Sequence, residues 1–312
     1  MESEYKRQSQ TEAQLVNEPS GTWGGSWTER KLLAFEKYVK AYLTILNNYR
    51  DKYNWKLVYF DGFAGSGSRI EEDKSECSNI SLFNEDEIEE REEKLYQGAA
   101  ERVLKLDIRG FDYYYFIERN PEALSKLETK LKSIPHKGLL AFRSEDANDE
   151  IKNLAKGFKD HPNLRGLVLL DPFGMQLDWS TLEQLKGCNI DLWILLPSGV
   201  IINRLLDRKG KLLFSDKLQK FFGLTEQEIR EFFYEKKKEM TLFGEEEVTT
   251  KQQNAVHRIA ELYTSRLKTL FTQVDDNPLI LYNDHGVPIF HFVFASNNPT
   301  ARKIAKEIVG KL

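Results

Sequence analysis

The stretch Leu-Val-Tyr-Phe-Asp-Gly-Phe-Ala-Gly-Ser-Gly, residues 57–67, decides the fold. It begins with an apolar run typical of a buried strand, and that run ends at Asp61. Three glycines lie within the next six residues, and glycine permits tight turns and a close approach of a ligand to the backbone. The sequence therefore predicts a strand that leads directly into a ligand-binding turn.

Further segments with strand composition follow the first one, and helical patterns separate them. They are residues 111–117, 139–143, 167–170 and 191–196. Strands that alternate with helices predict a Rossmann-like, doubly wound and mostly parallel α/β sheet. Two last apolar runs, 279–282 and 288–295, flank a turn sequence at 283–286, which predicts a C-terminal antiparallel hairpin.

Outside this alternation the sequence predicts a long helix, a tail and two insertions. Apolar residues recur at helical spacing over 28–49. Residues 1–21 are polar and are expected to form a disordered tail before one domain at 22–312. Residues 69–95 carry 11 acidic and 4 basic side chains and predict an acidic insertion. Residues 207–250, rich in Lys, Glu and Phe, predict a helical insertion.

Composition restricts the class of protein. Two cysteines among 312 residues exclude a disulfide framework, and no spacing of metal ligands is evident. No apolar run reaches membrane-spanning length, and the N-terminus does not resemble a signal peptide. We therefore expect a soluble cytoplasmic protein with no membrane partner. The net charge of −4 neither requires nor excludes a nucleic-acid partner, because the acidic insertion supplies most of the negative excess.

The pattern Asp61-x-Phe63-x-Gly65-x-Gly67 after a strand resembles motif I of S-adenosylmethionine-dependent methyltransferases. The resemblance implies that the Asp61 carboxylate meets the methionine amino group and that the turn passes beneath the cofactor. The turn residues expected at the cofactor are Gly62, Phe63, Ala64, Gly65 and Gly67. The alternative is a purely structural turn of an α/β protein.

Two further acidic positions fit the same cofactor. Glu118 ends the second strand, where a carboxylate can accept from both ribose hydroxyls. That position also suits a nicotinamide or flavin dinucleotide, or an acid that stabilises a helix N-terminus. Asp146, followed by Ala147, resembles the position that contacts adenine in these methyltransferases, although an Asp there can also cap a helix. Phe63 and the terminal hairpin favour the methyl donor.

The sequence Asp171-Pro172-Phe173-Gly174 follows the fourth strand and resembles motif IV of methyltransferases that act on amines of bases. It is also similar to the corresponding motif of tRNA guanine-N2 dimethyltransferases, although it departs from the Asp-Pro-Pro-Tyr form. An exocyclic amine is a poor nucleophile, and a carboxylate that accepts its N–H groups localises the lone pair. An aromatic ring can stack on an extruded base. We therefore predict Asp171, Pro172 and Phe173 as the catalytic residues.

Nearly the whole chain resembles the three-Cys-motif partner proteins. The matching stretches are Trp27, Lys31, Leu32 and Tyr38 in the first helix, and residues 59–67, 116–118, 170–175, 191–193, 197–200, 203–205, 242–244 and 292–297. The resemblance implies a methyltransferase-like protein that works beside a protein with three cysteines, which is thought to hold a radical-type iron–sulfur centre.

Three functions follow in order of preference. The first is an S-adenosylmethionine-dependent methyltransferase that acts on an amine of a nucleic-acid base. The second is an S-adenosylmethionine-binding subunit that is inactive without its three-cysteine partner, in nucleic-acid modification or phage defence. The third is a nicotinamide-dependent oxidoreductase, for which no pair of proton donors is evident.

Overall fold

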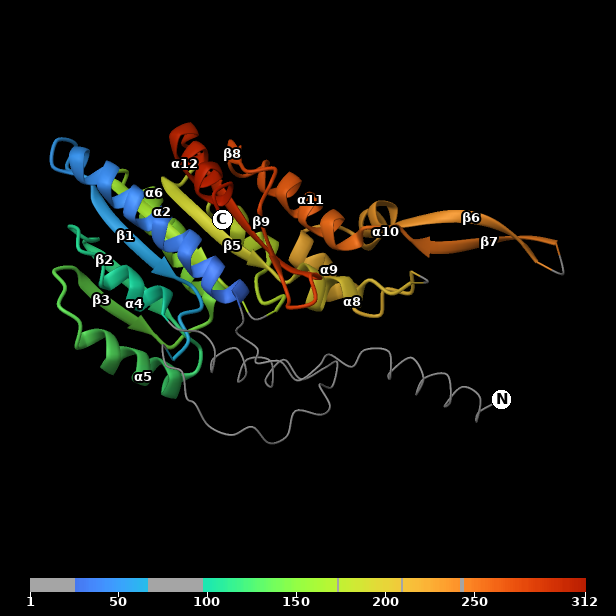
Figure 1. Ribbon diagram of the computed structural model, residues 1–312, viewed down its shortest axis with the longest axis horizontal. Helices are drawn as coiled ribbons and strands as arrows, with labels where there is room; N and C mark the ends of the chain where they lie inside the picture. The colour runs from blue at the N-terminus through green and yellow to red at the C-terminus, as the bar shows by residue number, and fades with distance from the viewer. Residues whose placement is uncertain (1–25, 67–97, 173, 209, 242–243) are drawn as a thin grey trace.

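The computed structural model describes residues 26–66, 98–172, 174–208, 210–241 and 244–312 (Figure 1). The predicted tail at 1–21 and the predicted acidic insertion at 69–95 lie outside these ranges. So do Gly67 and Phe173, two of the predicted site residues.

A single sheet of eight strands forms the centre of the molecule. Its strands are β1 (Lys56–Asp61), β2 (Tyr113–Ile117), β3 (Leu139–Arg143), β4 (Leu164–Leu170), β5 (Ile190–Leu196), β8 (Gln273–Val274), β9 (Leu279–Tyr282) and β10 (Pro288–Ser296). The order is β3-β2-β1-β4-β5-β10, with β8 and β9 paired to the outer side of β10. The first five strands run parallel, and β10 is antiparallel to β5. The predicted Rossmann-like sheet with a C-terminal antiparallel hairpin is confirmed.

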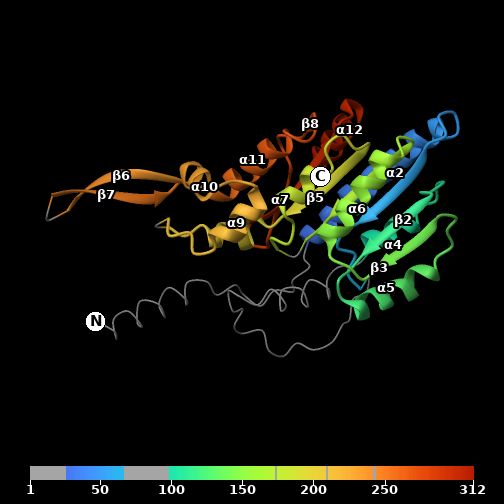
Figure 2. The same cartoon turned by 180° about the vertical axis from the view of Figure 1, so that it is seen from behind.

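Helices cover both faces of the sheet, because successive strand residues point to opposite sides. The helices are α2 (Ser26–Arg50), α4 (Ala99–Leu104), α5 (Pro121–Lys132), α6 (Ala147–Asp160), α7 (Trp179–Glu183), α8 (Asn203–Leu205), α9 (Ser215–Phe222), α10 (Glu226–Phe233), α11 (Ala255–Leu267) and α12 (Pro299–Val309). Tyr59 and Phe292 pack with α2, α4 and α12, whereas Phe60 and Val168 pack with α6, α7 and α11 (Figures 1 and 2). Among the described residues, no helix is long and apolar enough to cross a membrane.

The predicted hairpin at the C-terminal end is present and its turn has a clear physical basis. The Asn283 side chain accepts hydrogen bonds from the backbone of His285 and Val287, at 3.1 and 2.9 Å. Such Asn side-chain bonds stabilise turns. Strand β8 escaped prediction because two residues give no readable pattern.

The prediction of a helical insertion at 207–250 is wrong in its second half. Helices α9 and α10 are present, but β6 (Tyr234–Thr241) and β7 (Gly244–Lys251) form a two-stranded antiparallel ribbon that projects away from the sheet (Figure 1). The β-branched run 248–250 favours a strand. A mixture of Lys and Glu is compatible with an exposed β-ribbon as well as with an exposed helix. The charge pattern alone therefore could not distinguish the two structures.

A π-helix, η2 (Ser198–Ile202), follows β5 and packs closely on β10. The Ser198 hydroxyl lies 2.6 Å from Nδ1 of His291, and both side chains are buried. Gly199 makes this approach possible, since an added Cβ would lie 2.2 Å from the carbonyl oxygen of Pro288. The turn after β5 therefore depends on a glycine for space.

We expect Gly199→Ala to lower the free energy of unfolding by about 1–3 kcal/mol, because a backbone atom blocks the new methyl group. Gly157→Ala is the matched control: it lies within α6, and its added Cβ would meet nothing within 4 Å. That variant should gain about 0.5–1 kcal/mol from helix propensity. Urea denaturation measures both, and equal stability of the two variants would contradict the close approach.

Candidate cofactor and acceptor site

Three predicted acidic residues meet at one edge of the sheet. Asp61 ends β1, Glu118 follows β2 and Asp171 follows β4. These strands are parallel neighbours, with Asp61 in register with Phe116 and Leu169. Ligands of open α/β sheets bind at the carboxyl ends of the strands, which is where these carboxylates lie.

The backbone of the turn after β1 is fixed to both neighbouring strands. The N–H of Gly62 donates to the carbonyl of Leu169 at 2.9 Å, and that of Ala64 donates to Ile117 at 2.8 Å. Gly65 has φ of 60°, in the left-handed region that favours glycine. An added Cβ at Gly65 would meet no described residue within 4 Å, so the described residues leave open space beside this position.

Glu118 is held against the turn. Its Oε2 accepts from the N–H of Gly65 at 3.1 Å, and its Oε1 accepts from the N–H of Asn120 at 2.8 Å. The side chain remains partly exposed. These two bonds hold the Glu118 carboxylate beside the turn.

Asp61 lies beneath the turn and is fully buried. Its carboxylate accepts from the Tyr59 hydroxyl at 3.2 Å and from the N–H of Phe63 at 3.3 Å. Burial, followed by the nearby charge of Asp171, raises the pKa of Asp61 to about 7. The predicted contact with an amino group therefore requires the turn or its neighbours to open.

Asp171 forms a buried ion pair with Lys31 from α2. Nζ of Lys31 lies 2.6 Å from Oδ2 of Asp171, and both side chains are almost fully buried. The same ammonium lies 5.6 Å from the centre of the Trp27 ring. Sequence reasoning did not select Lys31 as a site residue. A lysine on the same helical face as Trp27, Phe35 and Tyr38 was the available signal, because lysine is almost never buried without a partner.

The remaining predicted residues are placed as follows. Asp146 is exposed and caps α6 by accepting from the N–H of Asn148 at 2.8 Å, which confirms the capping alternative. Its contact with adenine stays a prediction. Ala147 and Pro172 are buried. Asn148 binds the segment after β4 by donating to the carbonyl of Gln176 and accepting from the N–H of Asp178. Within the described ranges, no group of three or more His, Cys, Asp or Glu side chains could hold a metal ion.

We expect Lys31→Met to destabilise the protein by about 3–5 kcal/mol, because it leaves the Asp171 carboxylate buried without its cation. Adding Asp171→Asn to this variant should recover much of the loss. Lys152→Met removes the exposed Lys152–Asp149 pair and should change stability by less than about 1 kcal/mol. Urea denaturation of the native protein, Lys31→Met, Asp171→Asn and the double variant gives the coupling energy of the pair, and additive single effects would show that the pair contributes nothing.

Asp61 should make stability depend on pH. A carboxyl whose folded pKa is about 7, against an ordinary value of 3.8, binds its proton more tightly in the folded state. Its contribution is therefore complete at acid pH and is lost as the pH rises through 7. Between about pH 5 and about pH 7, the free energy of unfolding of the native protein should fall by roughly 2 kcal/mol more than that of Asp61→Asn. If the free energies of unfolding of the two proteins changed in parallel with pH, the raised pKa of Asp61 would be disproved.

No family model matches the chain, and no curated protein matches it. Several solved structures resemble it, two of which are the following. The first is protein LPL1258 from Legionella pneumophila str. Philadelphia 1, of the family model DUF519, with 14% identity, a TM-score of 0.39, and coverage of 89% of this chain and 99% of that one. The second is a complex of Trm1 from Pyrococcus horikoshii with S-adenosyl-L-methionine, with 11% identity, a TM-score of 0.39, and coverage of 90% and 57%. At these scores neither neighbour carries a functional argument. The methyltransferase-like fold follows from the strand order, and the resemblance to three-Cys-motif partner proteins rests on the quoted motifs alone.

Proposed function

We propose that the chain binds S-adenosylmethionine at the edge formed by β1, β2 and β4, and transfers its methyl group to an amine of a nucleic-acid base. One observation carries the proposal. The Glu118 carboxylate is fixed 3.1 Å from the N–H of Gly65, beside a turn position with open space. An acceptor-only group next to an open glycine backbone is suited to a nucleoside.

The residues present fit this cofactor in distinct ways. Glu118 would accept from the ribose hydroxyls, and the turn 62–65 would lie beneath the nucleoside. Asp146, whose carboxylate is exposed at the start of α6, would face the adenine amino group together with Ala147. Asp61 would act on the methionine ammonium through its charge, since it is fully buried. When bound, S-adenosylmethionine would supply an electrophilic methyl group.

Asp171 would orient the amine that receives the methyl group. Lys31 bonds to Oδ2, and no described residue bonds to Oδ1, so this oxygen can accept an N–H of the acceptor. The ion pair also keeps the carboxylate in one orientation. Pro172 and Phe173 would border the acceptor, in keeping with their place in the motif. The contribution of these residues is mainly positioning.

A second function is favoured by the burial of the two central carboxylates. Asp61 is completely buried and Asp171 is 7% exposed, so an acceptor reaches them only after the site opens. A subunit that binds the cofactor but needs its three-cysteine partner for opening would show this arrangement.

Calorimetric titration with S-adenosylmethionine tests the cofactor. We expect binding to the native chain, a loss of roughly 10-fold or more in Glu118→Gln, and no change in Glu122→Gln, a control at the exposed start of α5. A native chain that does not bind would overturn both functions.

Labelled cofactor with pooled DNA and tRNA then separates the two functions. Transfer by the chain alone supports an independent methyltransferase, and Asp171→Asn should abolish it while cofactor binding persists. Transfer only after the three-cysteine protein is added supports the second function.

A further inference from the structure

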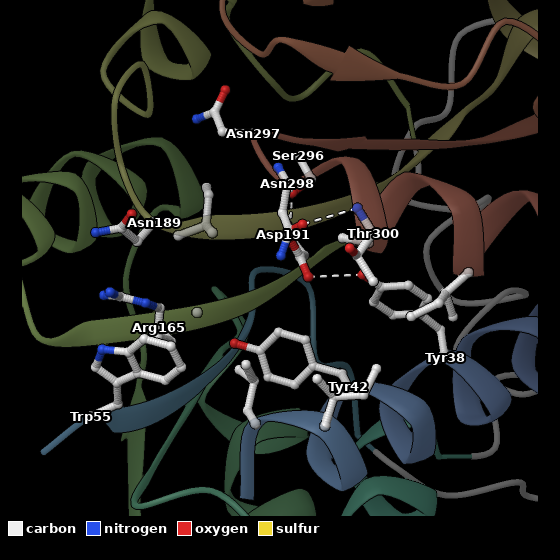
Figure 3. Close-up of a pocket in the computed structure, with 16 residues that line it drawn as sticks. Tyr38, Tyr42, Trp55, Arg165, Asn189, Asp191, Ser296, Asn297, Asn298 and Thr300 are labelled. Carbon is white, nitrogen blue, oxygen red and sulfur yellow. Dashed lines mark hydrogen bonds between the residues drawn. The ribbon is translucent and has the colours of Figure 1, made fainter. Parts of the chain in front are cut away.

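A pocket lies at the edge of the sheet opposite the candidate cofactor site (Figure 3). Its volume is about 200 Å³, and it opens between the start of β4 and β5, helix α2 and the start of α12. Arg165 and Asp171 lie near opposite ends of β4. They are six positions apart in an extended chain, or roughly 20 Å, so the pocket is distinct from the proposed cofactor site.

A buried hydroxyl without a partner marks this pocket. Tyr42 is 7% exposed, and its hydroxyl has no hydrogen-bond partner within the part of the chain that the structure describes. Figure 3 shows that hydroxyl directed toward Arg165 and Trp55, which form the side wall of the pocket. An unmade hydrogen bond of a buried group costs about 1–3 kcal/mol in general, and a ligand that supplies an acceptor would remove this penalty.

Arg165 and the start of α12 bring further donors to the pocket. The Arg165 guanidinium lies over Trp55 at 4.4 Å and donates through Nη1 to the carbonyls of Pro162 and Leu164. No described residue accepts from its Nη2. The N-terminus of the eleven-residue helix α12 borders the same space and adds a positive potential. An anionic acceptor suits these three features.

One acidic residue lines the pocket, and both of its carboxylate oxygens are already hydrogen-bonded. Asp191 accepts from the Tyr38 hydroxyl at 2.7 Å and from the Ser296 hydroxyl at 2.5 Å. Burial raises the pKa of Asp191 to about 6, so below that pH its carboxyl is neutral and does not repel a bound anion. The remaining walls are aliphatic and include Ile45, Leu46 and Ile304.

We propose that this pocket binds a small carboxylate with an aliphatic body. The ligand's carboxylate accepts from the Tyr42 hydroxyl and from Arg165, while its hydrocarbon part packs on the side chains of α2 and α12. The site is independent of the proposed cofactor and acceptor functions.

Calorimetric titration with 4-methylpentanoate tests the site. We expect a dissociation constant on the order of 1 mM, as befits so small a ligand. Tyr42→Phe should weaken binding roughly 10-fold, since a hydrogen bond to a charged group is lost. It should leave thermal stability unchanged or raised, because the hydroxyl has no partner to lose. Tyr282→Phe, on the exposed β9 tyrosine, is the matched control and should bind like the native chain.

Four results would overturn the proposal. Equal affinity of Tyr42→Phe and the native chain would mean that the hydroxyl contacts only water. Equal binding of the uncharged 4-methylpentan-1-ol would exclude a carboxylate site, and equal binding of inorganic phosphate would exclude the aliphatic contact. Arg165→Gln provides the second variant, and it should abolish the preference for the carboxylate over the alcohol. The proposal would also be overturned if the native chain gave no heat of binding at a ligand concentration about tenfold above the expected dissociation constant.

Discussion

The buried ion pair between Lys31 and Asp171 is the interaction on which the candidate site depends. It joins the long helix α2 to the carboxyl end of β4, although the two residues are 140 positions apart. Removing two charges from water is costly, and their attraction repays that cost only when geometry is good. The pair therefore explains the position of the helix and the orientation of the carboxylate together.

The same electrostatics govern Asp61. Its carboxyl shares the interior with Asp171, and that second negative charge adds to burial in raising the pKa of Asp61 to about 7. The Lys31 ammonium acts in the opposite direction on this pKa. A cationic ligand at this edge would stabilise the ionised form of Asp61. The edge is therefore more favourable for a cationic ligand than for an anionic one.

Each of the two edges of the sheet has a buried carboxyl that accepts a hydrogen bond from a tyrosine, but the surroundings of the two carboxyls differ. Tyr59 donates to Asp61 at the carboxyl edge, and Tyr38 donates to Asp191 at the opposite edge. Both carboxyls are buried and both have raised pKa values. Beside Asp61 there is a glycine turn and an acidic neighbour, whereas the pocket beside Asp191 offers an arginine and an unpartnered tyrosine hydroxyl. The two edges thus suit ligands of opposite charge.

The sequence by itself determined the succession of strands and helices along the chain, the glycine-rich turn after β1 and the terminal hairpin, because apolar periodicity and glycine placement are local properties. It also located Asp61, Glu118 and Asp171 at one edge, since parallel strands end together. Only the tertiary structure decided that Lys31 pairs with Asp171, that Asp146 caps α6, and that the region 234–251 is a ribbon. The pocket around Tyr42 likewise depends on α2, β4, β5 and α12 meeting. These features arise between segments distant in the chain, and the cost or gain of burying a charge is set only when those segments pack.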